Sequence, residues 1–131
     1  TTVTGYPNLF QLVGPNTGLG HNSIVFMIEA QVHYTLQCMK LLKQKGADYL
    51  DVKPHAQRRF NEKLQAKFKG TVWQSGCTSW YQQADGRNVM LWPGSTWRFW
   101  QQTRQVIEDD YTFTRCAAPV AQAVNAEVAA A

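Results

Sequence analysis

Three glycines within seven residues form the first pattern in this sequence that could hold a ligand. The loop runs from Gly14 to Gly20, and His21 to Ser23 lead from it into a long apolar segment. Glycines let the backbone approach a ligand closely, and the start of a following helix offers unpaired N–H groups and partial positive charge. The loop matches neither GxxxxGK[ST], because Leu19 stands at the second glycine position, nor GxGxxG. It therefore predicts either a site for an electron-rich or anionic group or a plain structural turn.

The other reactive side chains do not form a set with a known spacing. His21, His33 and His55 are not three or four residues apart, and none pairs with a cysteine at zinc-ligand spacing, so we expect no metal site. Cys77 is either a nucleophile or a half-buried strand residue. Glu29 is either a partly buried structural acid or a functional one. The serine-nucleophile signature GxSxG does not occur.

Aromatic and basic residues suggest a second kind of binding. All five tryptophans lie in the second half of the chain, and Trp97 and Trp100 have Arg98 and Arg104 nearby. Such a group stacks on bases, sugars or a flavin, or it packs into a core. Nine of the thirteen basic residues lie between Lys40 and Lys69, which is typical of a solvated helix face or of a patch for an acidic polymer.

The elements that must position these residues begin with a strand, a loop and a helix. Leu9 to Val13 reads as a short apolar strand that ends at Gly14. Behind the loop, apolar residues recur every three or four positions and predict a helix that ends near Lys43 to Gly46. The predicted stripe consists of Ile24, Ile28, Val32, Leu36 and Met39.

The rest of the chain alternates between short strands and helices. Tyr49 to Lys53 is a strand candidate, and Pro54 suits the first turn of a second helix that Gly70 would stop. Residues 71–73, 78–82 and 88–92 read as a tryptophan-rich antiparallel sheet with a turn at Asp85-Gly86. Ser95 would cap a C-terminal helix to Val106. The Ala-rich residues 116–131 predict a frayed or disordered tail.

Length and composition limit the chain to one α+β domain. Its 131 residues are 44% hydrophobic and 17% charged, with a net charge of +4 that is too weak to imply nucleic acid. Three widely spaced cysteines, Cys38, Cys77 and Cys116, and an uncharged start without a signal pattern predict a cytoplasmic protein. Residues 1–28 carry no Asp, Glu, Lys or Arg, yet Pro and Gly interrupt them too often for a membrane span.

Several longer strings resemble one enzyme family. Gly5–Phe10, Leu12–Ser23 and Phe26–Gln31 resemble the C-terminal part of the class B flavoprotein monooxygenases, that is, the Baeyer–Villiger and flavin-containing monooxygenases. Gly76–Tyr81, Gly86-Arg87 and Trp92-Pro93 are also similar to that family. The resemblance extends over about residues 1 to 113.

The resemblance implies an FAD- and NADPH-dependent enzyme. Family members trap O2 as a peroxyflavin and insert one oxygen atom into a ketone, amine or sulfide. In them the strand, glycine loop and helix close over the flavin, where a helix N-terminus stabilises negative charge on the ring. By this resemblance the cofactor-binding residues are Gly14, Pro15, Asn16, Gly20, His21, Asn22 and Ser23, and Trp80 faces the NADP site and the substrate pocket.

The chain also departs from that family. No GxGxxG motif for FAD or NADP is present, so residues 1–115 resemble a C-terminal segment of a larger two-dinucleotide-binding α/β enzyme. The implied partners are an N-terminal dinucleotide-binding portion, a small organic substrate and O2, with no membrane and no nucleic acid. We expect the chain alone to be inactive and not to retain FAD or NADP. Alternatives are a basic binding module and an interaction domain that self-associates through Leu9 to Val13.

Overall fold

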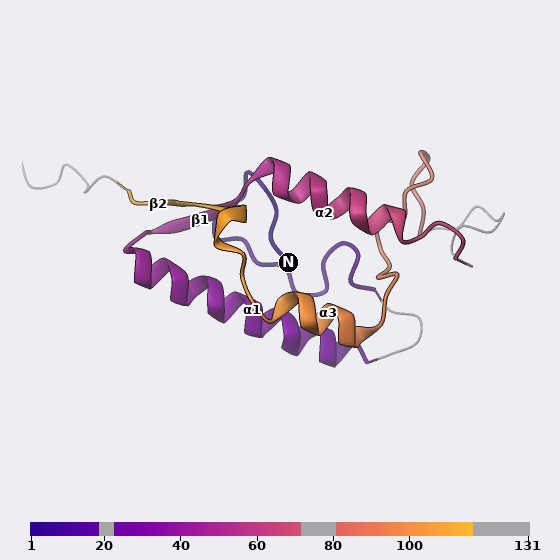
Figure 1. The fold of residues 1–131 in the computed structure, drawn as a ribbon, viewed down its shortest axis with the longest axis horizontal. Coiled ribbons are helices and arrows are strands. Elements are labelled where there is room, and N and C mark those ends of the chain that lie inside the picture. The colour runs from indigo at the N-terminus through magenta and orange to yellow at the C-terminus, as the bar shows by residue number, and fades with distance from the viewer. Residues whose placement is uncertain (19–22, 72–80, 117–131) are drawn as a thin grey trace, which may run out of the picture.

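The computed structural model describes residues 1–18, 23–71 and 81–116, which build a small α+β arrangement (Figure 1). The described elements are α1 (Ile24–Lys45), β1 (Tyr49–Val52), α2 (Pro54–Ala66), α3 (Thr96–Thr103), the 3₁₀ helix η2 (Glu108–Asp110) and β2 (Tyr111–Thr114). In Figure 1, α1 runs along one side of the molecule and α2 along the opposite side. The core lies between them and includes side chains of both helices. No helix among the described residues is long and apolar enough to cross a membrane.

The helix α1 follows its sequence signals closely. It starts after Ser23, whose backbone is extended, and its last turn contains Lys43 and Lys45. Gly46 then takes a left-handed conformation with φ 57°, and its N–H group bonds to the carbonyls of Leu42 and Lys43. A residue with a side chain would be strained in that conformation, so the predicted end of the helix is confirmed.

The strand β1 and the helix α2 also agree with the sequence. β1 precedes Lys53, which is extended, and Pro54 occupies the first turn of α2 as predicted. The helix ends at Ala66, and a turn leads on to Gly70, which has φ 77°. The partner of β1 was missed: β2 pairs with it antiparallel, with Tyr49 opposite Thr114 and Val52 opposite Tyr111.

The helix α3 starts as predicted but ends early. The Ser95 hydroxyl accepts a hydrogen bond from the Arg98 N–H at 3.3 Å, so the predicted cap is confirmed. The helix stops at Thr103 rather than Val106. Val106 instead packs against the buried cluster that contains Leu50 and Tyr111 of the two strands.

Leu9 to Val13 is not a strand, which corrects the prediction for this segment. The Val13 N–H donates to the Gln31 side chain at 3.0 Å, and the Gln11 N–H donates to the Thr1 carbonyl at 2.8 Å. Val13 also has φ 55°, which is incompatible with a strand. Among the described residues, this backbone is held by side chains and local turns, not by a neighbouring strand.

The predicted tryptophan-rich sheet is found only in small part among the described residues. The two-stranded sheet there is β1–β2, and neither strand contains tryptophan. Of the predicted strand pair 78–82 and 88–92, the described residues show one antiparallel bridge, between Gln82 and Asn88, while Leu91 forms a parallel bridge with Gly18. The Asp85-Gly86 turn is confirmed, because the Gly86 N–H bonds to the Gln83 carbonyl at 2.8 Å. Residues 72–80 and 117–131, with the strands and the tail predicted there, lie outside the described residues.

The core consists of two clusters, and α1 contributes to both. The first cluster joins Met27 and Ala30 of α1 to α2, α3 and the segment containing Leu91 and Trp92. The second joins Cys38 of α1 to the two strands and the start of α2. The members of the first are Met27, Ala30, Leu64, Phe68, Leu91, Trp92 and Phe99, and those of the second are Cys38, Leu50, Val52, Ala56 and Tyr111.

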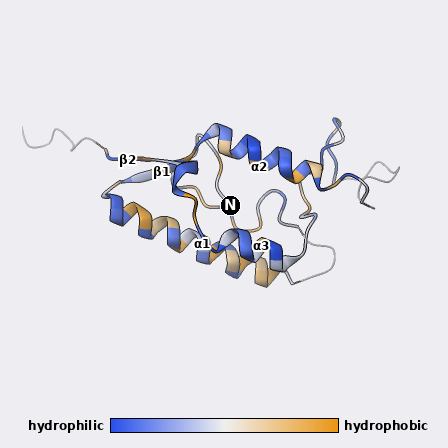
Figure 2. Ribbon diagram, in the orientation of Figure 1, coloured by the Kyte–Doolittle hydropathy of each residue, from blue (hydrophilic) through white to orange (hydrophobic). Residues whose placement is uncertain are grey.

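The predicted apolar stripe of α1 is only in part its buried face, because Ile24 packs against the first cluster but the later stripe residues do not. The buried residues of α1 are Met27, Ala30, Gln31 and Cys38, whereas Val32, Leu36 and Met39 are 40%, 58% and 55% exposed. Figure 2 shows hydrophobic residues along most of α1, with a hydrophilic end beside β1, whereas α2 is mainly hydrophilic. Periodicity identified a genuine apolar face, but from Val32 onward this chain buries the opposite one.

Candidate functional site

The first half of the glycine loop is fastened to residues 88–92 through its backbone. The Asn16 N–H donates to the Val89 carbonyl at 2.9 Å, and the Gly18 N–H donates to the Met90 carbonyl at 2.8 Å. The Gly18 carbonyl accepts from the Trp92 N–H at 2.8 Å. A Cβ atom on Gly18 would lie 2.8 Å from the Met90 carbonyl oxygen, so only glycine allows this approach.

The Asn16 side chain strengthens the same contact. Its Nδ2 donates to the carbonyls of Asn88 at 2.8 Å and Leu91 at 3.0 Å. Its backbone is left-handed with φ 56°, a conformation that asparagine tolerates better than most residues. Both amide hydrogens are therefore used within the chain, so Asn16 positions the loop and has no amide hydrogen left for a ligand.

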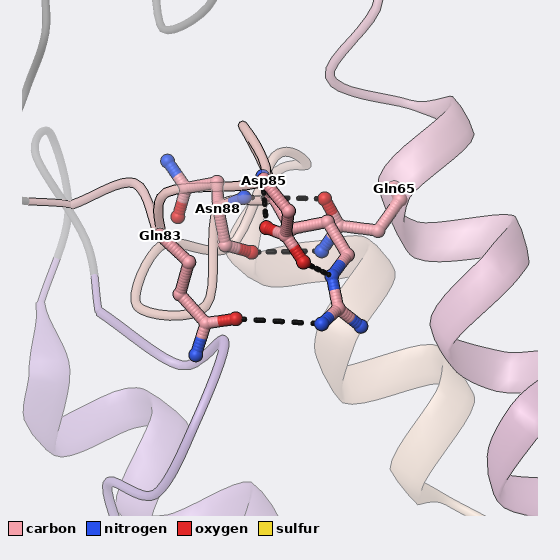
Figure 3. Close-up of polar contacts among 5 residues, drawn as sticks. Gln65, Gln83, Asp85 and Asn88 are labelled. Carbon is pink, nitrogen blue, oxygen red and sulfur yellow. Dashed lines mark hydrogen bonds and ion pairs between the residues drawn. The ribbon is translucent and has the colours of Figure 1, made fainter.

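A second layer of amides connects the loop to α2 (Figure 3). Gln65 of α2 faces the backbone of Asn88: its Nε2 donates to the Asn88 carbonyl at 2.7 Å, and its Oε1 accepts from the Asn88 N–H at 3.2 Å. The Asn88 side-chain oxygen accepts from the N–H groups of Met90 and Leu91. Asn88 is 2% exposed, and its buried Nδ2 has no hydrogen-bond partner among the residues that the structure describes. Hydrogen bonds thus run from α2 through Asn88 to the loop.

The turn beside Asn88 is held by an exposed ion pair. The Arg87 Nε donates to the Asp85 carboxylate at 2.6 Å, and Arg87 also reaches the Gln83 side chain (Figure 3). Hydrogen bonds from the backbone and side chain of Arg87 lower the pKa of the Asp85 carboxyl. The Asp85–Arg87 pair stabilises the turn. The loop itself is supported by the hydrogen bonds between Gln65 and Asn88.

Gln31 holds the chain just before the loop. It is fully buried in α1, and its Oε1 accepts from the Val13 N–H at 3.0 Å. Its Nε2 donates to the Gln11 carbonyl at 3.2 Å and to the Thr1 hydroxyl at 3.1 Å. Sequence reasoning missed the roles of Gln31, Gln65 and Asn88. The available signal for Gln31 was a polar residue on the side of α1 that also carries Met27 and Cys38.

Four of the eight predicted cofactor residues lie in the part of the chain that the structure describes. Gly14, Pro15, Asn16 and Ser23 are described, with Pro15 and Ser23 exposed. Ser23 makes no side-chain cap, and the first turn of α1 contains no acidic residue, so its N–H groups keep their partial positive charge. The others, Gly20, His21, Asn22 and Trp80, lie outside the described residues.

The remaining candidates are separate from this loop. Glu29, His33 and His55 are exposed, and Cys77 lies outside the described residues. Within residues 1–18, 23–71 and 81–116, no three His, Cys, Asp or Glu residues gather as metal ligands. Burial raises the pKa of the Cys38 thiol to about 11, which keeps it protonated and unreactive at neutral pH.

The tryptophans and basic residues contact each other and their neighbours. Trp92 is buried edge-on against Phe99, and Trp100 lies 4.5 Å from Trp97 and 4.4 Å from the Arg104 guanidinium. The 3₁₀ helix η2 supplies acidic partners to the basic region. Lys45 pairs with Glu108 at 2.7 Å, and Arg59 pairs with Asp110. These contacts favour structural roles for both groups.

Comparison with known proteins finds relatives that match most of this chain. The chain is 53% identical over 116 residues to a Baeyer–Villiger monooxygenase of Pseudomonas aeruginosa, a match that covers 87% of this chain and 22% of that protein. It is 43% identical over 118 residues to a Baeyer–Villiger monooxygenase of Streptomyces coelicolor, covering 88% of this chain and 23% of that protein. The chain is homologous to a segment of the Baeyer–Villiger monooxygenases.

A solved structure of another monooxygenase shares the fold. An oxidized steroid monooxygenase bound to NADP matches with a TM-score of 0.72 at 20% identity, over 88% of this chain and 22% of that one. This match concerns the fold. No protein-family model matches the chain. The chain spans about a fifth of the length of the curated Baeyer–Villiger monooxygenases that it matches.

Proposed function

We propose that this chain forms the flavin-facing segment of an FAD- and NADP-dependent monooxygenase of the Baeyer–Villiger type. The identity of 53% to the Pseudomonas aeruginosa enzyme carries the proposal. FAD would supply the oxygen-activating chemistry and NADPH the electrons, so that one oxygen atom of O2 enters a ketone, amine or sulfide. Activity requires the larger part of the enzyme, and the isolated chain is inactive.

The loop geometry supports a role beside the flavin. The two bonds between Gly18 and residues 90–92 and the bonds of Asn16 hold the described half of the loop in one place. The start of α1 follows, without acidic side chains that would repel a negatively charged ring. In this proposal Gly14 and Pro15 line the flavin together with Gly20, His21, Asn22 and Ser23. Asn16 acts by holding the loop, and Trp80 faces the NADP site.

The domain limits and the location are also proposals. We assign residues 1–115 to the enzyme segment and 116–131 to a tail. The β1–β2 sheet, which ends at Thr114, agrees with that limit. A cytoplasmic location is supported by the free thiols of Cys38 and Cys116.

A segment exchange tests the proposed function. The matched 116 residues of the Pseudomonas aeruginosa enzyme are replaced by the corresponding residues of this chain. Bound FAD is measured by absorbance, and NADPH-dependent conversion of a ketone to an ester by gas chromatography. We expect the chimera to retain FAD and convert the ketone. A well-expressed chimera that lacks flavin would refute the proposal.

A further inference from the structure

The helix α1 is apolar on two opposite sides. Its core side carries Met27, Ala30 and Cys38, all buried. The other side carries Val25, Val32, Leu36 and Met39, which are 40–58% exposed and follow one another at seven, four and three residues. At 100° per residue these four positions fall within about 60° of each other. Helices that are apolar all round are normally buried on all sides.

This outer face continues onto the segment before the glycine loop. Leu12 is 46% exposed, and a groove of about 170 Å³ lies between Phe10 and Leu12 on one side and Val32, Thr35 and Leu36 of α1 on the other. The patch therefore joins a helix face to a stretch with a strand-like sequence. Contiguous apolar surfaces of this kind mark interaction sites.

We propose that this surface, formed by Leu12, Val25, Val32, Leu36 and Met39, is where the remainder of the monooxygenase packs. The inference rests on the proposed function. The chain matches only 22% of the Pseudomonas aeruginosa enzyme, so a much larger partner is required by that homology. The backbone of Leu9 to Val13 is already bonded within the chain, since the N–H groups of Gln11 and Val13 donate to the Thr1 carbonyl and the Gln31 side chain. A partner therefore reaches this surface through side chains, and one apolar layer of the remaining enzyme would cover the helix face and the adjoining groove together.

The experiment compares one substitution in two settings. Leu36→Asp is made in the isolated 131-residue chain and in the full-length chimera described above. Phe60→Asp is the matched control, because Phe60 is a helical residue of α2 that is 49% exposed, against 58% for Leu36. Thermal unfolding is followed in both proteins. Bound FAD is measured in the chimera, and the mass in solution of the isolated chain by light scattering.

The expected result is a loss confined to the chimera. In the isolated chain, Leu36→Asp should change the thermal unfolding midpoint by less than about 2 °C, since the side chain faces water. In the chimera the acid would be buried, so the same substitution should lower the midpoint by about 5 °C or more and cause loss of FAD. Phe60→Asp should be mild in both. If Leu36→Asp and Phe60→Asp had equal effects in a chimera that still binds flavin, the proposed packing surface would be wrong and the proposed function would stand. A dimeric isolated chain that Leu36→Asp makes monomeric would assign the surface to a second copy instead. An unsubstituted chimera without flavin refutes the proposed function itself.

Discussion

Gly18→Ala is the substitution that most directly tests how the glycine loop is held. The added methyl group would lie 2.8 Å from the Met90 carbonyl oxygen, whereas ordinary contacts of a Cβ atom begin near 3.4 Å. The obstructing atom belongs to the backbone of residues 88–92, which Gln65 and Asn16 also hold. The loop and this segment must therefore move apart.

The cost follows from the two hydrogen bonds that this movement weakens. The Gly18 N–H to Met90 carbonyl bond and the Trp92 N–H to Gly18 carbonyl bond are both 2.8 Å long. Each contributes about 1 kcal/mol net, for a loss of about 2–3 kcal/mol when their geometry is broken in a partly buried setting. Alanine restricts the unfolded chain and returns about 0.4–1 kcal/mol. The free energy of unfolding should fall by about 1–2.6 kcal/mol.

Urea denaturation monitored by tryptophan fluorescence measures this change. A shift of the midpoint at an unchanged slope m reports a change in stability. Gly14→Ala is the comparison within the same loop, because its methyl group would meet the Cβ and Oε1 atoms of Gln11 at 3.0 Å and no carbonyl oxygen of another segment. The Oε1 atom can rotate away and the Cβ atom needs a shift of only a few tenths of an ångström, so we expect a smaller cost than for Gly18→Ala, of about 0.5 kcal/mol. The reasoning fails if Gly18→Ala is as stable as wild type, or if Gly14→Ala costs as much.

Three further predictions follow from other contacts. Gln65→Ala should lower the free energy of unfolding, measured in urea, by about 1–2 kcal/mol, since it removes both bonds to the Asn88 backbone. Arg87→Ala removes only exposed contacts, to Asp85 and Gln83, and should change that free energy by less than about 0.5 kcal/mol. A larger cost for Arg87→Ala than for Gln65→Ala would contradict the proposed support of the loop. Burial raises the pKa of Cys38 from 9.0 to about 11, so the folded state binds the thiol proton more tightly than the unfolded state does. The free energy of unfolding should therefore fall as the pH rises from 9 to 11. Urea midpoints across that pH range measure this change, and a midpoint that rises with pH would contradict the prediction. The isolated chain should not bind FAD tightly, and calorimetric titration giving a dissociation constant below micromolar would disprove this.

The helices show how far local patterns reach. Gly46, Pro54 and Ser95 act through their own backbone or first turn, so the end of α1 and the starts of α2 and α3 could be predicted from neighbouring residues. The sheet could not, because Tyr49–Val52 pairs with Tyr111–Thr114, about sixty residues later. No local signal indicates which distant segment a strand will join.

The candidate site divides in the same way. The glycine loop and the start of α1 could be found from residue types and spacing. Asn88 and Gln65 could not, because their importance depends on α2 lying against residues 88–92. Leu9 to Val13 failed for a related reason. A short apolar run that ends at Gly-Pro suits a strand, but a strand forms only where another chain segment accepts its hydrogen bonds.

The sequence by itself determined the elements whose signals are local and the likeness to the Baeyer–Villiger monooxygenases. Tertiary structure alone decided which side of α1 is buried, since both sides are apolar and only packing distinguishes Met27 from Leu36. It also decided that Asn16 donates its amide hydrogens to the chain, because the carbonyls that accept them come from residues more than seventy positions away. Periodicity records which residues avoid water, and the arrangement in space determines what covers them.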